Sequence, residues 1–315
     1  MSPHHTTEAD AAAADAAATP AAIARARRKA ALAGFWRDYR SHRAGVLGLV
    51  MLGVFALVAV GAPLLADPAG LDITRVTAPS HAAPSPAYPL GTDENGRSIL
   101  TLLIYGTRIS LLVGLAATAI SVAIGAAMGV AAGFYGRWLR SLLMGITDWF
   151  LVIPFLPLAI VLGTLFGASL LNIIVVIGIT SWPGTARLVA AQALTVRSRP
   201  YLERAKALGA DDWHQMTRHV LPNVMPLVLA NTVLTVSVAI LSETTLSFLG
   251  LGDPTQVSWG SILDHANGSG AMSRHEWWFV LPPGICVVLV VLGFTLVGRT
   301  LESVLNPRLR EAGGR

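Results

Sequence analysis

Long apolar stretches alternate with shorter polar ones along this chain of 315 residues. Hydrophobic residues make up 53% of it and charged residues 13%, against roughly 25% charged residues in a soluble domain. A helix of roughly 20 apolar residues crosses a hydrocarbon core of about 30 Å. The pattern therefore predicts an all-α membrane protein with six transmembrane helices. They are expected at Ala44–Leu65, Ile109–Gly133, Leu142–Phe166, Ser169–Ala190, Val224–Leu246 and Trp278–Arg299.

Polar segments divide the chain around these spans. Residues 1–21 are Ala-rich and of low complexity, so we expect a disordered tail. Residues 22–43 mix basic with large apolar side chains, which predicts a basic amphipathic helix along the inner membrane surface. A partner-binding helix is the alternative. The remaining parts are the first span with its external loop (44–108), the core of five spans (109–305) with a second external loop (250–277), and a cytoplasmic tail (306–315).

The distribution of basic residues predicts the orientation of the chain in the membrane. Cytoplasmic loops are enriched in Lys and Arg, and an N-in, C-in topology places 19 of the 23 Lys and Arg residues on the cytoplasmic side. The four outside are Arg75, Arg97, Arg108 and Arg274. Because the basic residues are not gathered into one patch, the net charge of +5 does not indicate a nucleic-acid partner.

Neither metal binding nor disulfide chemistry is expected. The single cysteine, Cys286, lies in an apolar run, which indicates a small packing residue. The outer loop contains Asp253, Asp264, His265 and His275, whose spacing fits no tight set of metal ligands.

A charged segment, 197–222, separates the fourth and fifth spans. Ser198 can cap a helix that has Pro200 in its first turn, and Glu203 lies where the helix dipole favours an anion. Gly209 then ends this helix, as glycine commonly does.

A second short helix is predicted after the glycine. Asp211 or Asp212 can cap it, and we expect it to run to Leu221, where Pro222 closes it. The result is a helix–turn–helix that projects into the cytoplasm and can act as a rigid lever on the membrane helices.

The spacing of this segment resembles the cytoplasmic loop of ABC importer permeases, E-A-A-x3-G-x9-I-x-L-P. The matching residues are Glu203, Ala205, Gly209, Leu221 and Pro222. Arg204 and His219 depart from the pattern, since Ala and Ile are usual there. In the permeases that it resembles, the helix after the glycine sits in a groove of the ATPase subunit. The resemblance therefore also implies a coupling role for Ala210, Asp211, Asp212 and Trp213.

Two further stretches are similar to dipeptide/oligopeptide permeases. One is 89–111, P-L-G-T-D-E-N-G-R-S-I-L-T-L-L-I-Y-G-T-R-I-S-L, and the other is 243–260, E-T-T-L-S-F-L-G-L-G-D-P-T-Q-V-S-W-G. Over about residues 35–310 the chain thus resembles the C-type subunit of dipeptide/oligopeptide/nickel ABC importers (DppC/OppC-like). The resemblance implies the type I ABC importer permease fold, a bacterial inner membrane, and dipeptides or oligopeptides as substrate.

The resemblance also implies partners. They are a second, B-type permease subunit, two ABC ATPase subunits and an extracytoplasmic substrate-binding protein. The chain has no G-x-x-x-x-G-K-[ST] loop to cradle a phosphate. We therefore expect no enzyme activity and no cofactor of its own, with ATP and Mg²⁺ bound by the ATPase subunits.

Small and polar residues within the spans give two further predictions. A small residue at every fourth position of the second span predicts close helix packing, at Ser121, Gly125, Gly129 and Gly133. Polar residues within the spans are candidates for a pathway or gate because burying them in lipid is costly. They are Asp148, Ser237, Ser242, Glu243 and Thr244. The alternatives are interhelical pairing for Asp148, hydrogen bonds across helices for the hydroxyls, and contact with interfacial water for Glu243.

Three other functions are alternatives to this interpretation. The same type of importer could carry nickel, glutathione or another small solute. A self-sufficient secondary transporter predicts repeats or paired broken helices, and neither is evident in the sequence. An intramembrane hydrolase would need a base near Ser242 and Glu243, and no histidine lies in a predicted span.

Overall fold

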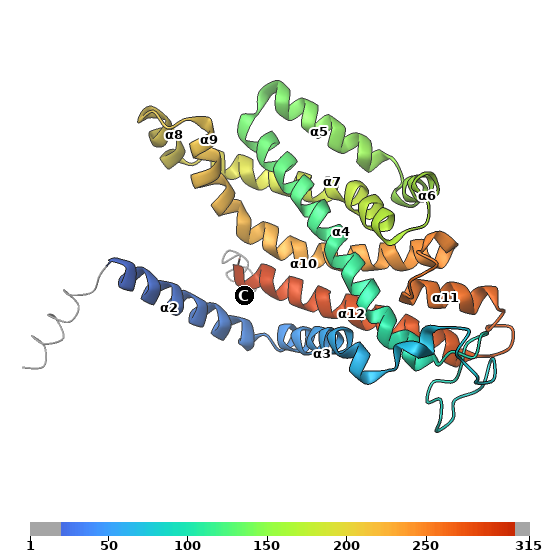
Figure 1. The fold of residues 1–315 in the computed structure, drawn as a ribbon. Helices are drawn as coiled ribbons and strands as arrows, with labels where there is room; N and C mark the ends of the chain where they lie inside the picture. Colours follow the sequence, from blue (N-terminus) through green and yellow to red (C-terminus); the bar gives the residue numbers. More distant parts are fainter. Residues whose placement is uncertain (1–19, 306–315) are drawn as a thin grey trace, which may run out of the picture.

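The computed structural model describes residues 20–305, which are mostly helical (Figure 1). Residues 1–19 and 306–315, where the two tails were predicted, lie outside the described residues. The helices are α2 (Pro20–Ser41), α3 (Arg43–Leu65), η1 (Pro68–Leu71), α4 (Ile99–Tyr135), α5 (Arg137–Val152), α6 (Phe155–Phe166), α7 (Leu170–Arg197), α8 (Pro200–Ala207), α9 (Asp212–Gln215), η2 (Met216–Val220), α10 (Leu221–Leu246), η3 (Ser247–Leu251), α11 (Trp259–Gly268) and α12 (Trp277–Leu305).

Five of the described helices are long and apolar enough to cross a membrane. They are α3, α4, α7, α12 and the continuous run Asp212–Leu251, which joins α9, η2, α10 and η3. A sixth span results if α5 and α6 are counted together, although they are bent by 89°. Ile153 precedes Pro154 and is extended (φ −73°, ψ 122°), because the proline ring disfavours the helical conformation there. The third predicted span is therefore broken into two helices.

The predicted external loops are partly helical. α4 begins at Ile99 rather than Ile109, so residues 99–108 lengthen the second span at its N-terminal end. Its 37 residues are about 55 Å long, well beyond the thickness of a hydrocarbon core. α11 forms within the loop predicted at 250–277, where Ser258 and Ser261 make a reciprocal capping box.

The glycines of the second span, for which close packing was predicted, lie against α7. A Cβ added at Gly125 would come within 2.7 Å of the Thr185 side chain, and one at Gly129 within 2.6 Å of the Ala186 carbonyl oxygen. At Gly133 the added Cβ would lie 2.5 Å from that of Ala193. Ser121, one turn before Gly125, is 1% exposed. The two backbones therefore approach too closely for larger side chains.

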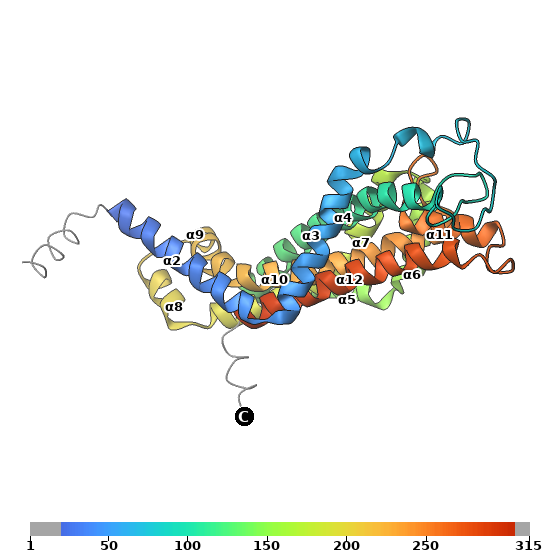
Figure 2. The ribbon, with the colours of Figure 1, turned by 90° about the horizontal axis from the view of Figure 1, so that it is seen from below.

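The bundle has two distinct ends. α2, α8, α9 and the end of α12 gather at one of them, and the segment before α4 gathers with α11 at the other (Figures 1 and 2). α2 begins at Pro20, slightly before the predicted start, and extends from the bundle as an arm (Figure 2). Its junction with α3 is held by Tyr39, whose hydroxyl donates to the Gly45 carbonyl oxygen at 3.0 Å.

Candidate coupling site

The two short helices α8 and α9 form the projection, residues 200–215, at one end of the bundle. α8 ends at Ala207 with Leu208 as its C-cap, and the next residue, Gly209, has a φ of +87°, in the left-handed region that glycine adopts without strain. The Gly209 N–H donates to the Lys206 carbonyl oxygen and the Ala210 N–H to that of Ala205, both at 3.0 Å. These two bonds make a Schellman motif, so the turn predicted at the glycine is confirmed.

The second helix of the projection is fixed by side chains on both sides of the turn. Of the two predicted caps, Asp211 is the one that accepts a hydrogen bond from the His214 N–H, at 2.9 Å. Gln215 is buried, and its Nε2 donates to the Ala210 carbonyl oxygen at 2.9 Å. The turn from α8 to α9 is therefore held as a unit.

The prediction that Pro222 closes this helix is wrong. The helix passes through Leu221 and Pro222 and continues as α10. The proline nitrogen has no hydrogen for the carbonyl one turn back, and the preceding π-helical turn, Met216–Val220, widens the helix at this point. In that turn the Leu221 N–H donates to the Met216 carbonyl oxygen, five residues back. The projection is thus joined to a membrane span without a loop.

One buried side chain anchors the projection to the bundle. Leu202 is 3% exposed and packs in an apolar cluster with Val130 and Phe134 of α4 and Val189 of α7. Glu203 and Asp212 line a hollow of about 400 Å³ at the base of the projection.

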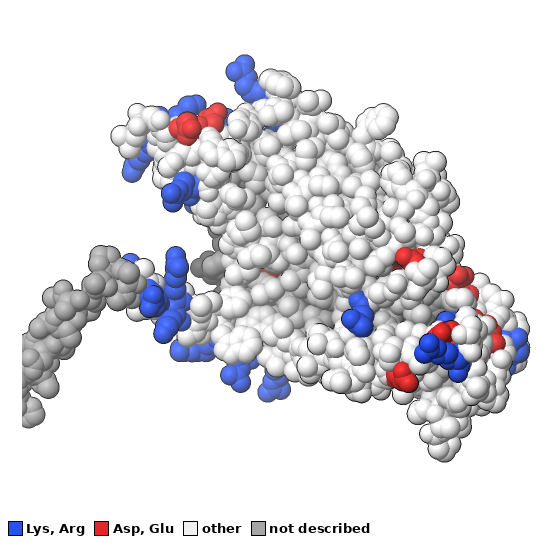
Figure 3. All heavy atoms as spheres, in the orientation of Figure 1, with Lys and Arg blue, Asp and Glu red and all other residues white. Residues whose placement is uncertain are grey.

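The outward surface of the projection combines apolar and unpaired charged side chains. Leu208 is 88% exposed and Trp213 65%. Within residues 20–305, none of the charged side chains here takes part in an ion pair. They are Glu203, Arg204, Lys206, Asp211, Asp212 and, just beyond, Arg218. Figure 3 shows acidic and basic atoms together on this end. Such a surface suits a protein partner that supplies the missing contacts.

The polar residues predicted for a pathway or gate are mostly inside the subunit. Ser237 donates to the Val291 carbonyl oxygen of α12 at 3.4 Å, which is the alternative of bonding across helices. Ser242 bonds to Val238 within α10, and both it and Thr244 are buried. Asp148 instead lies on the surface, paired with Arg187 between α5 and α7.

Glu243 lies in the interior, at 1% exposure, and does not reach interfacial water. Its carboxyl group accepts from the hydroxyls of Ser110 (3.2 Å) and Ser247 (2.8 Å). The Ser110 hydroxyl in turn accepts from the backbone N–H of Trp259, at 3.2 Å. Through these bonds Glu243 connects α4, α10 and α11.

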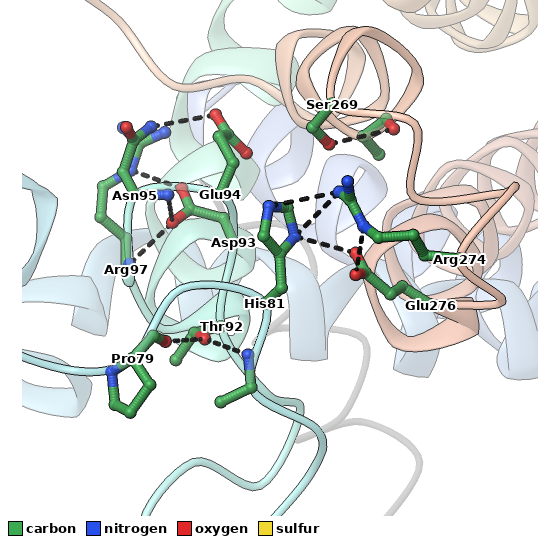
Figure 4. A network of polar contacts seen from close by, with 12 residues as sticks. Pro79, His81, Thr92, Asp93, Glu94, Asn95, Arg97, Ser269, Arg274 and Glu276 are labelled. Carbon is green, nitrogen blue, oxygen red and sulfur yellow. Dashed lines mark hydrogen bonds and ion pairs between the residues drawn. The ribbon is translucent and has the colours of Figure 1, made fainter.

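At the opposite end, the sequence analysis missed a polar network that Figure 4 shows from close by. Asp93 is fully buried and pairs with the Arg97 Nε at 2.6 Å. It also accepts from the backbone N–H groups of Asn95 and Arg97, in a turn where Gly96 has a φ of +81°. The D-E-N-G-R run at residues 93–97 is typical of such a turn. The sequence alone could therefore have predicted this part of the network.

The rest of this network joins segments far apart in the chain. The His81 Nδ1 lies 3.0 Å from Glu276, and the Arg274 Nε lies 2.7 Å from the same buried carboxylate (Figure 4). His265 pairs with Glu94 at 3.0 Å. The bond to Glu94 raises the pKa of His265. Burial opposes ionisation of Glu94, but the bond from His265 holds the pKa of Glu94 below its ordinary value.

Fold and site together define a multi-span helical membrane protein that presents a charged helical projection at one end of its bundle. The chain belongs to the family of binding-protein-dependent transport system inner membrane components, whose family model matches residues 99–311. The model for the N-terminal TM domain of oligopeptide transport permease C matches residues 30–84.

Similar proteins carry related names. A dipeptide transport system permease protein DppC of Haemophilus influenzae is 34% identical over 288 residues, 90% of this chain and 97% of the relative. DppC of Alkalihalophilus pseudofirmus is 34% identical over 282 residues, 87% of this chain and 90% of the relative. A glutathione transport system permease protein GsiD of Pectobacterium atrosepticum is 33% identical over 280 residues, 88% of this chain and 91% of the relative.

Proposed function

We propose that this chain forms half of the translocation pathway of an ATP-driven peptide importer, and that the projection docks on an ATPase subunit. The observation that carries the coupling role is the continuous helix Asp212–Leu251, whose first turn carries the exposed Trp213. An ATPase that displaces α9 displaces α10 directly, because no flexible loop separates them. α10 packs against α4 and α12, so this motion reaches the bundle interior.

The distribution of basic residues supports an N-in, C-in orientation. α2, the projection and the end of α12 lie at the same end, and Figure 3 shows basic side chains on α2 and the projection. Lys and Arg favour the cytoplasmic side. An ATPase could reach the projection only there, and the basic arm α2 would then lie near the anionic headgroups of the inner leaflet.

The family and its relatives support a class of substrate and a set of partners. Relatives named for dipeptides and for glutathione, itself a small peptide, support a short peptide as the transported solute. A second, B-type permease would complete the pathway, and an extracytoplasmic binding protein would deliver the peptide. Two ATPase subunits would bind ATP and Mg²⁺, so that this chain needs no cofactor or catalytic site.

Co-purification with two glycine variants tests the docking role. Gly209→Arg forces a side chain into a left-handed turn of the projection, and Gly270→Arg does the same at the opposite end, where φ is +73°. Both positions are open, so the strain is matched. We expect wild type and Gly270→Arg to retain the ATPase subunits and Gly209→Arg to lose them. Equal retention by all three would contradict docking through the projection.

Stimulation of ATP hydrolysis tests the substrate. The complex with its binding protein, reconstituted in lipid, should hydrolyse ATP faster with dipeptides than without them. Stimulation by glutathione and not by dipeptides would indicate that glutathione is the transported solute. Uptake that persists after ATP depletion would instead favour a secondary transporter.

A further inference from the structure

A pocket of about 940 Å³ opens between α3 and α4, at the end of the bundle opposite the projection. Ala59 and Val60 of α3 and Leu112 of α4 form its apolar wall. Arg108 enters from α4, one helical turn before Leu112. Polar residues also line the pocket, among them Asp72, Thr74, Arg97, Tyr105, Thr255 and Gln256.

Arg108 is the unpaired cation of this pocket. Within the described part of the chain it has no hydrogen bond or ion pair, and it is exposed. The second arginine, Arg97, is already paired with Asp93. The one acidic lining residue, Asp72, accepts from Thr74 and lies 3.3 Å from Arg75. The pocket therefore offers a free guanidinium beside an apolar wall.

Helix lengths place the pocket at the edge of the hydrocarbon core. Val60 is about 26 Å along α3 from Arg43, and Arg108 is about 40 Å along α4 from Tyr135, at about 1.5 Å per residue. With a core about 30 Å thick, Val60 is inside the core, Leu112, about 35 Å along α4 from Tyr135, is at its edge, and the guanidinium is at headgroup level. Val60 is 83% exposed and Leu112 49%, so this wall is open to whatever surrounds the subunit.

We propose that this pocket binds an anionic amphiphile, a phospholipid of the leaflet opposite the projection. The Arg108 guanidinium would hold the phosphate through two N–H groups, a geometry that arginine provides and lysine does not. An acyl chain would lie along Val60 and Leu112, removing their apolar surface from water at the membrane edge. A short peptide could supply a carboxylate, but it offers the apolar wall only separate side chains, whereas an acyl chain covers the wall continuously. A phospholipid therefore matches both the guanidinium and the wall.

Photocrosslinking in native membranes tests this site in the assembled complex. A photoreactive residue replaces Leu112, and the adduct is identified by mass. A second reporter replaces Val288 of α12, which is 63% exposed and lies outside this pocket. We expect a phospholipid adduct at position 112 that falls about tenfold in Arg108→Gln, the loss expected for a charge-assisted hydrogen bond. The adduct at position 288 should not change.

Arg140→Gln is the matched control, because Arg140 of α5 is also an exposed arginine without an ion pair in the described residues, and it does not line the pocket. It should leave the lipid adduct at position 112 at the wild-type level. An adduct with a polypeptide alone would show that Arg108 meets a partner chain and would overturn the proposal. Equal lipid adducts in wild type and Arg108→Gln would overturn it too, because the guanidinium would then not contribute to lipid binding.

Discussion

The two ends of the bundle differ in whether their charged side chains form ion pairs within the chain. At the end opposite the projection, which is external in the proposed orientation, Asp93, Glu94 and Glu276 each have a basic partner within the chain, at 2.6 to 3.0 Å. At the projection, no described charged side chain takes part in an ion pair. The aromatic residues differ likewise, since Trp259 is fully buried at the external end and Trp213 is 65% exposed on the projection.

This contrast separates a stabilising end from a docking end. Buried carboxylates with their own cations make the external segments part of the folded subunit. Exposed apolar and unpaired charged groups contribute little to the stability of the subunit, but they are available to a partner. Substitutions at the two ends should therefore affect different measurements.

The largest effect on stability is expected for Asp93→Ala. It leaves the Arg97 guanidinium, 8% exposed as a residue, without its carboxylate, and removing one partner of a buried pair costs about 3–5 kcal/mol. The free energy of unfolding of the purified chain measures this. Asp212→Ala, at the exposed end, should change it by less than about 0.5 kcal/mol. Equal losses in the two variants would remove the contrast between the ends.

The reverse outcome is expected for Trp213→Ala. Loss of an exposed aromatic anchor should weaken ATPase binding by about 2 kcal/mol, roughly 30-fold, without changing the melting temperature. Trp277→Ala is the control, since Trp277 is 56% exposed at the other end. Titration of the ATPase subunit against each permease variant gives the affinities. Similar weakening by both variants would mean that docking is not localised to the projection.

A smaller effect is expected for the helix cap of α9. Asp211→Ala removes the acceptor for the His214 N–H and should cost about 1 kcal/mol of local stability. Hydrogen exchange of the amides around residues 212–216 should accelerate, while Asp211→Asn, which keeps an acceptor, should exchange almost as wild type. Acceleration in both variants would show that charge rather than capping holds the turn.

The smallest effect concerns pH at the external end. His265 has a raised pKa, so its pair with Glu94 stabilises fully below the unfolded pKa of histidine and is lost as pH rises through the folded value. The lowered pKa of Glu94 adds stability above the unfolded pKa of glutamate, which is lost as pH falls through its folded value. His265 is half exposed, so the total should stay below about 1 kcal/mol.

Melting curves between pH 5 and 8 should show this difference as wild type minus His265→Gln. The wild-type advantage should shrink as pH rises. His214→Gln in the projection, where no carboxylate is paired with the histidine, serves as control. A difference that grows with pH would contradict the assignment of the pair.

Sequence reasoning succeeded where one local rule decides the structure. Gly209 and Asp211 form the turn and the cap because backbone conformation and capping are local. The spacing from Gly125 to Gly133 predicted close packing for the same reason. The prediction that Pro222 closes the helix was wrong. A proline near the start of a helix can be accommodated by a wider turn, and such a turn depends on the residues before it.

The parts that were missed depend on contacts across the chain. Contact with interfacial water was an alternative for Glu243, but Ser110, which is 133 residues away, and α11 enclose it. His81 and Glu276 are 195 residues apart and neither suggests the other. α4 begins early because Ile99 and Leu102 pack against Trp259, which hydropathy alone does not show.

The most direct measurement of coupling is crosslinking from the tip of the projection. A photoreactive residue replaces Leu208, which is 88% exposed, and another replaces Met272, which is 71% exposed at the external end. In the intact complex, position 208 should crosslink to an ATPase subunit with a yield that changes when ATP is added, and position 272 should not. ATPase adducts from neither position, or from both alike, would contradict docking at the projection.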